Sequence, residues 1–111
     1  GKMRKYRVEC LVCSHYSGSS FDTIYSDLVS DDIEADSPLE VLKLVKDYIC
    51  SDNYENGYRT EKDGDSVKVY KVSPLGNCKN KICELVSFVG AYTDFRVYEI
   101  DDNGEKIPVD V

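Results

Sequence analysis

The chain has 111 residues, of which 41% are hydrophobic and 32% charged, and it carries a formal net charge of −7. This length suits one hydrophobic core, so we expect residues 1–111 to form a single compact domain. No apolar run approaches the roughly 18 residues of a membrane-spanning helix, and the acidic balance lacks the basic surface that nucleic-acid phosphates require, so we expect neither membrane nor direct nucleic-acid binding.

The residues before the helix predict two strands. Residues 5–14 are rich in β-branched and aromatic side chains, which is typical of a strand. In such a strand one face would hold Tyr6, Val8, Cys10 and Val12, and the other would hold Arg7, Glu9, Leu11 and Cys13. The predicted elements are a strand at 5–14, a polar loop at 15–20, a second strand at 21–29 and a short extended piece at 33–35.

Residues 37–50 predict an amphipathic helix. Ser37 is a favourable N-cap, Pro38 suits the first helical position, and Glu40 is placed to accept a bond from the amide of Ser37. At 100° per residue, six apolar side chains fall within an arc of roughly 160° that we expect to pack on the core. They are Val41, Leu42, Leu44, Val45, Tyr48 and Ile49.

The second half of the chain predicts mainly strands. A two-residue Asp63-Gly64 turn is expected to join the arms of a hairpin, and residues 81–89 fit either a helix or a strand, of which we favour the strand because Ile, Val and Phe dominate. The predicted elements are a loop at 51–57, hairpin arms at 58–62 and 66–72, a break at 73–77, a strand at 94–101, a turn at 102–104 and an edge strand at 106–111. Together these elements predict an α+β fold, a mostly antiparallel sheet with the helix of residues 37–50 on one face.

The five cysteines do not predict a metal centre. In a chain without an apolar signal segment we expect a cytoplasmic location and reduced thiols. Cys10 and Cys13 could pair with Cys78 and Cys83 as zinc ligands, but positions 10 and 13 of a strand point to opposite faces. We therefore expect no metal and no cofactor.

No constellation of residues predicts catalysis. Cys50 lies on the polar side of the helix and is expected to be the most accessible thiol, but nothing in the sequence places His15 beside it as a base. The acidic pieces around Asp52 and Gly57 miss the calcium-loop pattern, because Tyr54 stands where an oxygen ligand is needed. We therefore expect a protein that is not an enzyme.

The distribution of acids predicts a protein-binding surface. Residues 8–42 hold eight Asp or Glu and no Lys or Arg, and the chain has nine tyrosines and no tryptophan. Tyrosine combines contact area with a hydroxyl group, and clustered carboxylates attract a basic protein surface. The candidate partner-binding residues are Asp22, Tyr25, Asp27, Asp31, Asp32 and Glu34.

Three functions therefore remain open. The first is a small acidic binding module that docks on a basic partner, for example a phage- or mobile-element-type regulator or a nucleic-acid mimic. The second is an assembly subunit that forms a homo-oligomer through an exposed sheet edge, where the acids serve solubility. The third is a small ligand-binding protein or enzyme with a site between helix and sheet.

Overall fold

The computed structural model describes the backbone of residues 3–17, 22–78 and 81–111, and the side chains within these ranges except at 15–17, 22–26, 76–78 and 81–82. In this part of the chain, one helix packs on a six-stranded antiparallel sheet, which confirms the predicted α+β class. The elements are β1 (Arg4–Ser17), β2 (Asp22–Ala35), α1 (Pro38–Glu55), β3 (Tyr58–Asp63), β4 (Ser66–Cys78), β5 (Lys81–Ile100) and β6 (Lys106–Pro108).

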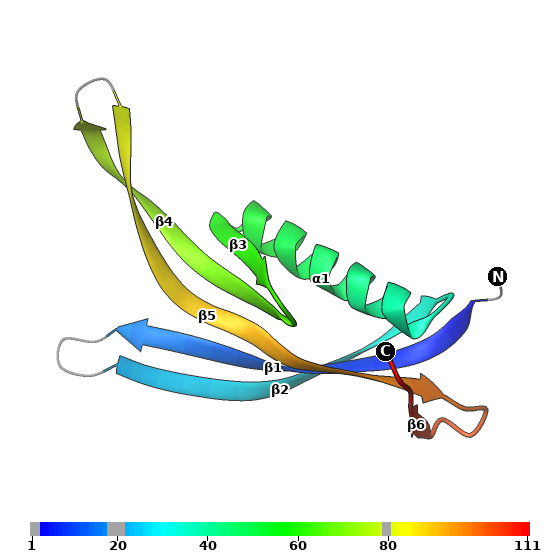
Figure 1. Ribbon diagram of the computed structural model, residues 1–111. Helices are drawn as coiled ribbons and strands as arrows, with labels where there is room; N and C mark the ends of the chain where they lie inside the picture. The colour runs from blue at the N-terminus through cyan, green and yellow to red at the C-terminus, as the bar shows by residue number, and fades with distance from the viewer. Residues whose placement is uncertain (1–2, 18–21, 79–80) are drawn as a thin grey trace.

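The sheet consists of two long antiparallel pairs joined at the centre. Its strand order is β2-β1-β5-β4-β3, and the short β6 pairs with the end of β5. The pairs β1–β2 and β4–β5 extend as separate arms beyond the region covered by α1, giving an elongated molecule of 60 × 33 × 21 Å (Figure 1). Because β1 pairs with β5, with Tyr6 opposite Glu99, the two ends of the chain meet in the middle of the sheet.

Gly90 permits the close approach of β5 to β1. A Cβ atom at this position would overlap the carbonyl oxygen of Cys13 on β1. A second irregularity lies nearby, where the β1–β5 register shifts between Glu9 and Leu11. Asp94 of β5 adopts a positive φ of 53°, which is uncommon for a residue with a side chain. The central pairing is therefore close but bent, as bulged strands usually are.

The helix begins as the sequence predicts and ends later. The Oγ atom of Ser37 accepts a bond from the amide of Glu40 at 3.2 Å. The Glu40 carboxylate accepts from the amide of Asp36 at 3.2 Å, not from that of Ser37 as predicted. The helix continues to Glu55 and closes at Asn56, whose amide donates to the Asp52 carbonyl. The predicted loop at 51–57 is therefore wrong for residues 51–55, because the polar run SDNYE continues the exposed side of the helix.

The core lies between α1 and one face of the sheet. Tyr6 and Val8 of β1, Val97 of β5, Ala35 and Val41 form one buried cluster. Tyr6, Val8 and Cys10, which the alternation places on one face of β1, are all buried. Within the predicted apolar arc, only Val41 and Ile49 are fully buried, while Leu44 and Tyr48 remain exposed.

Several predicted strand boundaries are wrong, although the strands themselves are present. The prediction of strand at 81–89 is confirmed, but it joins the later strand in one continuous β5. The gap between 29 and 33 and the break at 73–77 are both strand, because pairing with β1 and β5 keeps them extended. The hairpin turn consists of Gly64 and Asp65, one residue later than predicted, since Asp63 pairs with Ser66. Residues 15–17 of the predicted loop belong to β1, and residues 18–20 lie outside the described residues.

Val41 offers a direct test of the helix–sheet packing. Its side chain is fully buried, at 0% exposure, so Val41→Asp would place an unpaired charge in the core. We expect this variant to lose most of the roughly 5–15 kcal/mol that stabilises a domain of this size. Lys43→Asp, on the exposed side of the same helix, should cost less than about 1 kcal/mol. Chemical denaturation of both variants measures the difference, and equal losses would contradict the described orientation of α1.

Candidate protein-binding surface

Strand β2 forms one edge of the sheet. Among the described residues, no strand pairs with the side of β2 that faces away from β1. The side chains of residues 27–32 are all exposed, including Leu28 at 66% and Val29 at 45%. An edge strand of this length presents a row of backbone amides and carbonyls that another strand can use.

The strand divides the predicted binding residues between its two faces. Asp27 and Asp31 share parity with Ile33, which packs against the core, so they lie on the face toward α1. Asp32 and Glu34 lie on the opposite face, where the register places them beside Arg7 and Lys5 of β1. The side chains of Asp22 and Tyr25 lie outside the described residues. The acids therefore form two small groups, and only the group facing α1 has no basic residue opposite it on β1.

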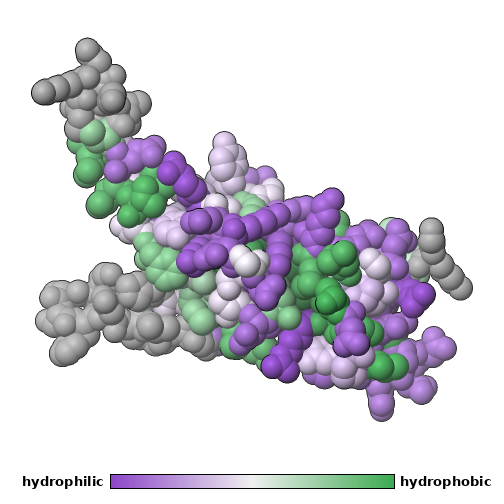
Figure 2. Space-filling view, in the orientation of Figure 1, coloured by the Kyte–Doolittle hydropathy of each residue, from purple (hydrophilic) through white to green (hydrophobic). Residues whose placement is uncertain are grey.

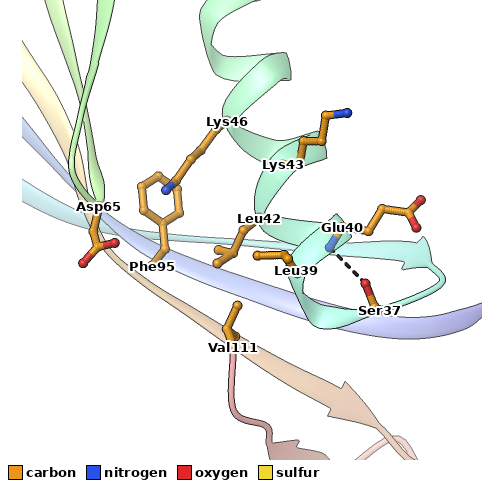
Figure 3. A pocket seen from close by; sticks show the side chains of 9 residues that line it. All are labelled: Ser37, Leu39, Glu40, Leu42, Lys43, Lys46, Asp65, Phe95 and Val111. Carbon is orange, nitrogen blue, oxygen red and sulfur yellow. Dashed lines mark hydrogen bonds between the residues drawn. The ribbon is translucent and has the colours of Figure 1, made fainter.

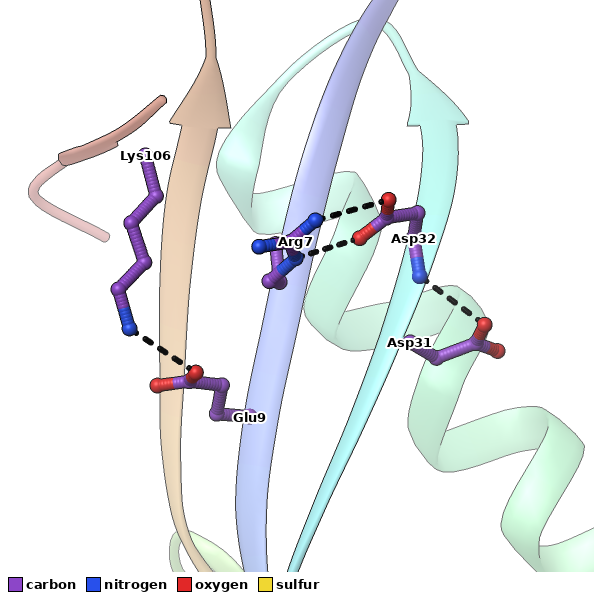
Figure 4. Close-up of polar contacts among 5 residues, drawn as sticks. All are labelled: Arg7, Glu9, Asp31, Asp32 and Lys106. Atoms are coloured by element: carbon purple, nitrogen blue, oxygen red, sulfur yellow. Dashed lines mark hydrogen bonds and ion pairs between the residues drawn. The ribbon is translucent and has the colours of Figure 1, made fainter. Parts of the chain in front are cut away.

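Asp32 is neutralised by an ion pair. Two side-chain nitrogens of Arg7 donate to its two carboxylate oxygens at 2.7 and 3.2 Å (Figure 4). The hydrogen bond from Arg7 is the largest cause that lowers the pKa of Asp32. On the same face, Lys106 of β6 donates to Glu9 of β1 at 3.1 Å across the intervening β5. This face is therefore a network of internally paired charges, and Asp32 is a poor candidate for attracting a partner.

Asp31 covers part of the free edge. Its Oδ1 atom accepts a hydrogen bond from the backbone amide of Asp32 at 2.9 Å, and Figure 4 shows the Asp31 carboxylate on the side of β2 away from β1. In an antiparallel pair, alternate residues direct their amides outward. The amide of Asp32 is therefore an outward one, and the outward positions of this stretch are residues 28, 30, 32 and 34.

An apolar groove of about 350 Å³ lies between this edge region and α1. Leu44 and Tyr48 of the helix form one flank, with exposures of 39% and 70%. Among the described residues that line the groove, two are Asp and none is Lys or Arg. The lining residues are Val8, Cys10, Val29, Asp31, Ile33, Leu44, Val45, Tyr48, Ile49, Asp52 and Tyr92. The sequence places a possible site between helix and sheet but does not predict that Leu44 and Tyr48 line it, because both fit the apolar arc of a fully covered helix.

A wider hollow of about 830 Å³ lies beside the first turns of α1 (Figure 3). Hydrophobic surface gathers over this half of the helix and along the β4–β5 arm (Figure 2). Lys46 lies over the ring of Phe95, 5.3 Å from its centroid, and Lys43, Glu40 and Asp65 line the same hollow. Its charges are of both signs and do not converge on one point, so it provides less basis for recognition than the groove.

The cysteines lie in different environments. Cys10 is buried beneath α1, where burial raises the pKa of its thiol, while Cys50 is half-buried on the helix. Cys83 is disulfide-bonded, so the expectation of reduced thiols throughout is wrong. The side chains of Cys78 and His15 lie outside the described residues.

The described residues hold no candidate metal site and no membrane-spanning helix. Among the described residues, no three His, Cys, Asp or Glu side chains group as metal ligands. In the same part of the chain, no helix combines the length and the apolar character needed to cross a membrane. Comparison with known proteins finds no matching family model and no significant match among curated proteins or solved structures.

The Arg7–Asp32 pair predicts a dependence of stability on pH. Because the folded pKa of Asp32 is lowered from 3.8, the pair stabilises the fold above that pH and ceases to do so as the pH falls through the folded pKa. We expect a double-mutant cycle with Arg7→Gln and Asp32→Asn to give a coupling energy at pH 7 that disappears on acidification. A coupling energy that persists in acid would contradict a charged pair.

The thiols predict an order of alkylation. Burial at 6% exposure, together with the raised pKa, should make Cys10 slower than Cys50 toward iodoacetamide in the native state. Peptide mapping after brief exposure to the reagent, with Cys50→Ser and Cys10→Ser variants as controls, measures the two rates. If Cys10 reacts first, α1 does not cover β1 as described.

Proposed function

We propose that this chain is a small, non-enzymatic protein-binding module whose acidic β2 region docks on a basic surface of a partner protein. The observation that carries the proposal is an edge strand that holds five acidic residues and no Lys or Arg, with its outer side unpaired among the described residues. Complementary charge of this kind mainly increases the association rate and excludes partners of the same sign.

The acids facing α1 contribute most to this proposal. Asp27 and Asp31 are exposed, and no described side chain forms an ion pair with either. Asp52 lies at the groove that Asp31 also lines, which adds a third carboxylate on this side. A partner cation here would meet carboxylates whose charge is not already compensated, unlike that of Asp32.

Self-assembly through β2 is the second candidate, because a long unpaired edge is the feature that strand-to-strand oligomers use. The charge of β2 argues against it. Antiparallel pairing of two copies of β2 would bring together two strands whose charged residues are all acidic, and like charges facing one another across strands are destabilising. The same edge therefore favours a partner of opposite charge over a second copy of this chain.

Two finer features belong to the proposal. A regulator of the phage or mobile-element type, acting as a nucleic-acid mimic, would place these carboxylates in the phosphate-binding groove of its partner.

We also propose a cytoplasmic location, which suits the thiols of Cys10 and Cys50, whereas the disulfide at Cys83 is more usual in oxidising compartments. The location is tested by counting the free thiols of the protein after it is isolated from its native host under acid quench.

Charge neutralisation tests the proposal. The variant Asp27→Asn/Asp31→Asn/Glu34→Gln changes the net charge from −7 to −4 on and beside the β2 edge. The control Glu55→Gln/Asp102→Asn/Asp110→Asn makes the same change at exposed positions elsewhere. We expect proteins captured from an extract of the native host by the wild type and the control to be lost with the β2 variant.

Capture by the wild type should also weaken between low and physiological salt, where the Debye length falls to about 8 Å. Sedimentation of the purified wild type tests the rival at the same time, since an assembly subunit should form its own oligomer. If all three proteins capture the same set in the same amounts, the acidic surface is not the docking surface.

A further inference from the structure

We propose that the partner binds as an added strand on the outer edge of β2, with an extended segment that alternates basic and apolar side chains over the groove beside α1. This inference rests on the proposed function and adds to it the mode of binding and the chemistry of the partner. Strand addition of this kind obtains affinity from main-chain hydrogen bonds and specificity from alternate side chains.

The outer edge of β2 has backbone groups that an added strand can use. Among the described residues, the outer side of β2 has no paired strand, and the outward amide of Asp32 bonds only locally, to the carboxylate of Asp31. A carbonyl of an added strand can replace that carboxylate as the acceptor. Asp31 is then released from its own backbone and becomes available to a cation on the incoming segment. The contact that covers the edge in the free protein thus becomes a binding contact in the complex.

The side chains of β2 favour particular residue types on the added strand. On the face toward α1, β2 reads acidic, apolar, acidic, apolar at Asp27, Val29, Asp31 and Ile33. The Cβ atoms of directly opposite residues on β2 and an added strand lie about 4.5–5.5 Å apart. Each β2 side chain therefore favours a complementary side chain directly opposite it. Carboxylates select Lys or Arg, and the two aliphatic positions select Val, Ile or Leu. Every second residue of the added segment lies on this face, and these residues should be basic and apolar in turn.

Two exposed apolar side chains of α1 lie beside the edge that the added strand would occupy. Leu44 and Tyr48 project beside this edge with exposures of 39% and 70%, although they belong to the apolar side of α1. A strand added to β2 would extend the sheet beneath them and cover both. Leu39 is equally exposed at 70% but lines the other hollow, so an added strand on β2 would not reach it.

A synthetic peptide tests the geometry with the intact protein. The sequence Lys-Val-Thr-Lys-Thr-Val-Leu-Lys, acetylated and amidated, places Lys opposite Asp27 and Asp31 and Val opposite Val29 and Ile33 in antiparallel register. Its third and fifth residues, both Thr, then direct their amides to β2, while the fourth and sixth direct theirs away. We expect N-methylation of the third and fifth residues to weaken binding at least about tenfold, and N-methylation of the fourth and sixth to change it little.

Protein variants and hydrogen exchange complete the test. Leu44→Ser and Tyr48→Ser should weaken the peptide severalfold, whereas the matched Leu39→Ser should not. The amides at positions 28, 30, 32 and 34 should exchange with solvent more slowly when the peptide is bound. Protection confined to these alternate positions supports strand addition over attachment by charge alone.

The outcomes separate the two proposals. If both N-methylated peptides bind as tightly as the parent and binding still falls with salt, strand addition is wrong and docking by charge stands. If the peptide fails to bind while host proteins are lost on neutralising β2, strand addition is again wrong and the proposed function stands. If host capture does not depend on the β2 acids, the proposed function itself fails, whatever the peptide does.

Discussion

The pairing of β1 with β5 is the interaction on which the rest of the structure depends. It joins the β1–β2 hairpin to the β4–β5 pair. It also places Tyr6 and Val8 beside Val97, and Val41 packs on the buried surface that these residues form. The close approach at Gly90 allows this pairing to continue toward the arms. Without this pairing, α1 would pack on only part of the present sheet surface, and β2 would no longer be the edge of a larger sheet.

Local signals in the sequence predict much of this fold. Ser37 and Pro38 define the start of the helix because capping is decided within one turn, and the faces of β1 follow from its alternation. The length of β2 is harder to predict from the sequence, because Asp31 and Asp32 are poor strand formers by propensity alone. They are extended because β1 pairs with them and Arg7 lies opposite Asp32, and a pairing partner distant in sequence leaves no local signal.

The candidate surface was predicted only in part. The sequence identifies the acids of β2, but not that Arg7 compensates Asp32 while Asp31 remains unpaired with a base. The groove depends on where α1 crosses the sheet, and a helical periodicity cannot say which flank of an apolar arc will lack a covering strand. Leu44 and Tyr48 therefore resemble core residues in the sequence, and only the position of β2 as the last strand leaves them exposed.

The central pairing also determines when the chain can finish folding during synthesis. Tyr6 pairs with Glu99, so β1 has no partner on its inner side until β5 has left the ribosome. Until then the β1–β2 hairpin and α1 are present, but the buried surface that contains Val8 and Cys10 is incomplete. Contacts so distant in sequence form slowly. The nascent protein therefore exposes its core face for longer than a fold of local pairings would, a stage at which chaperones bind.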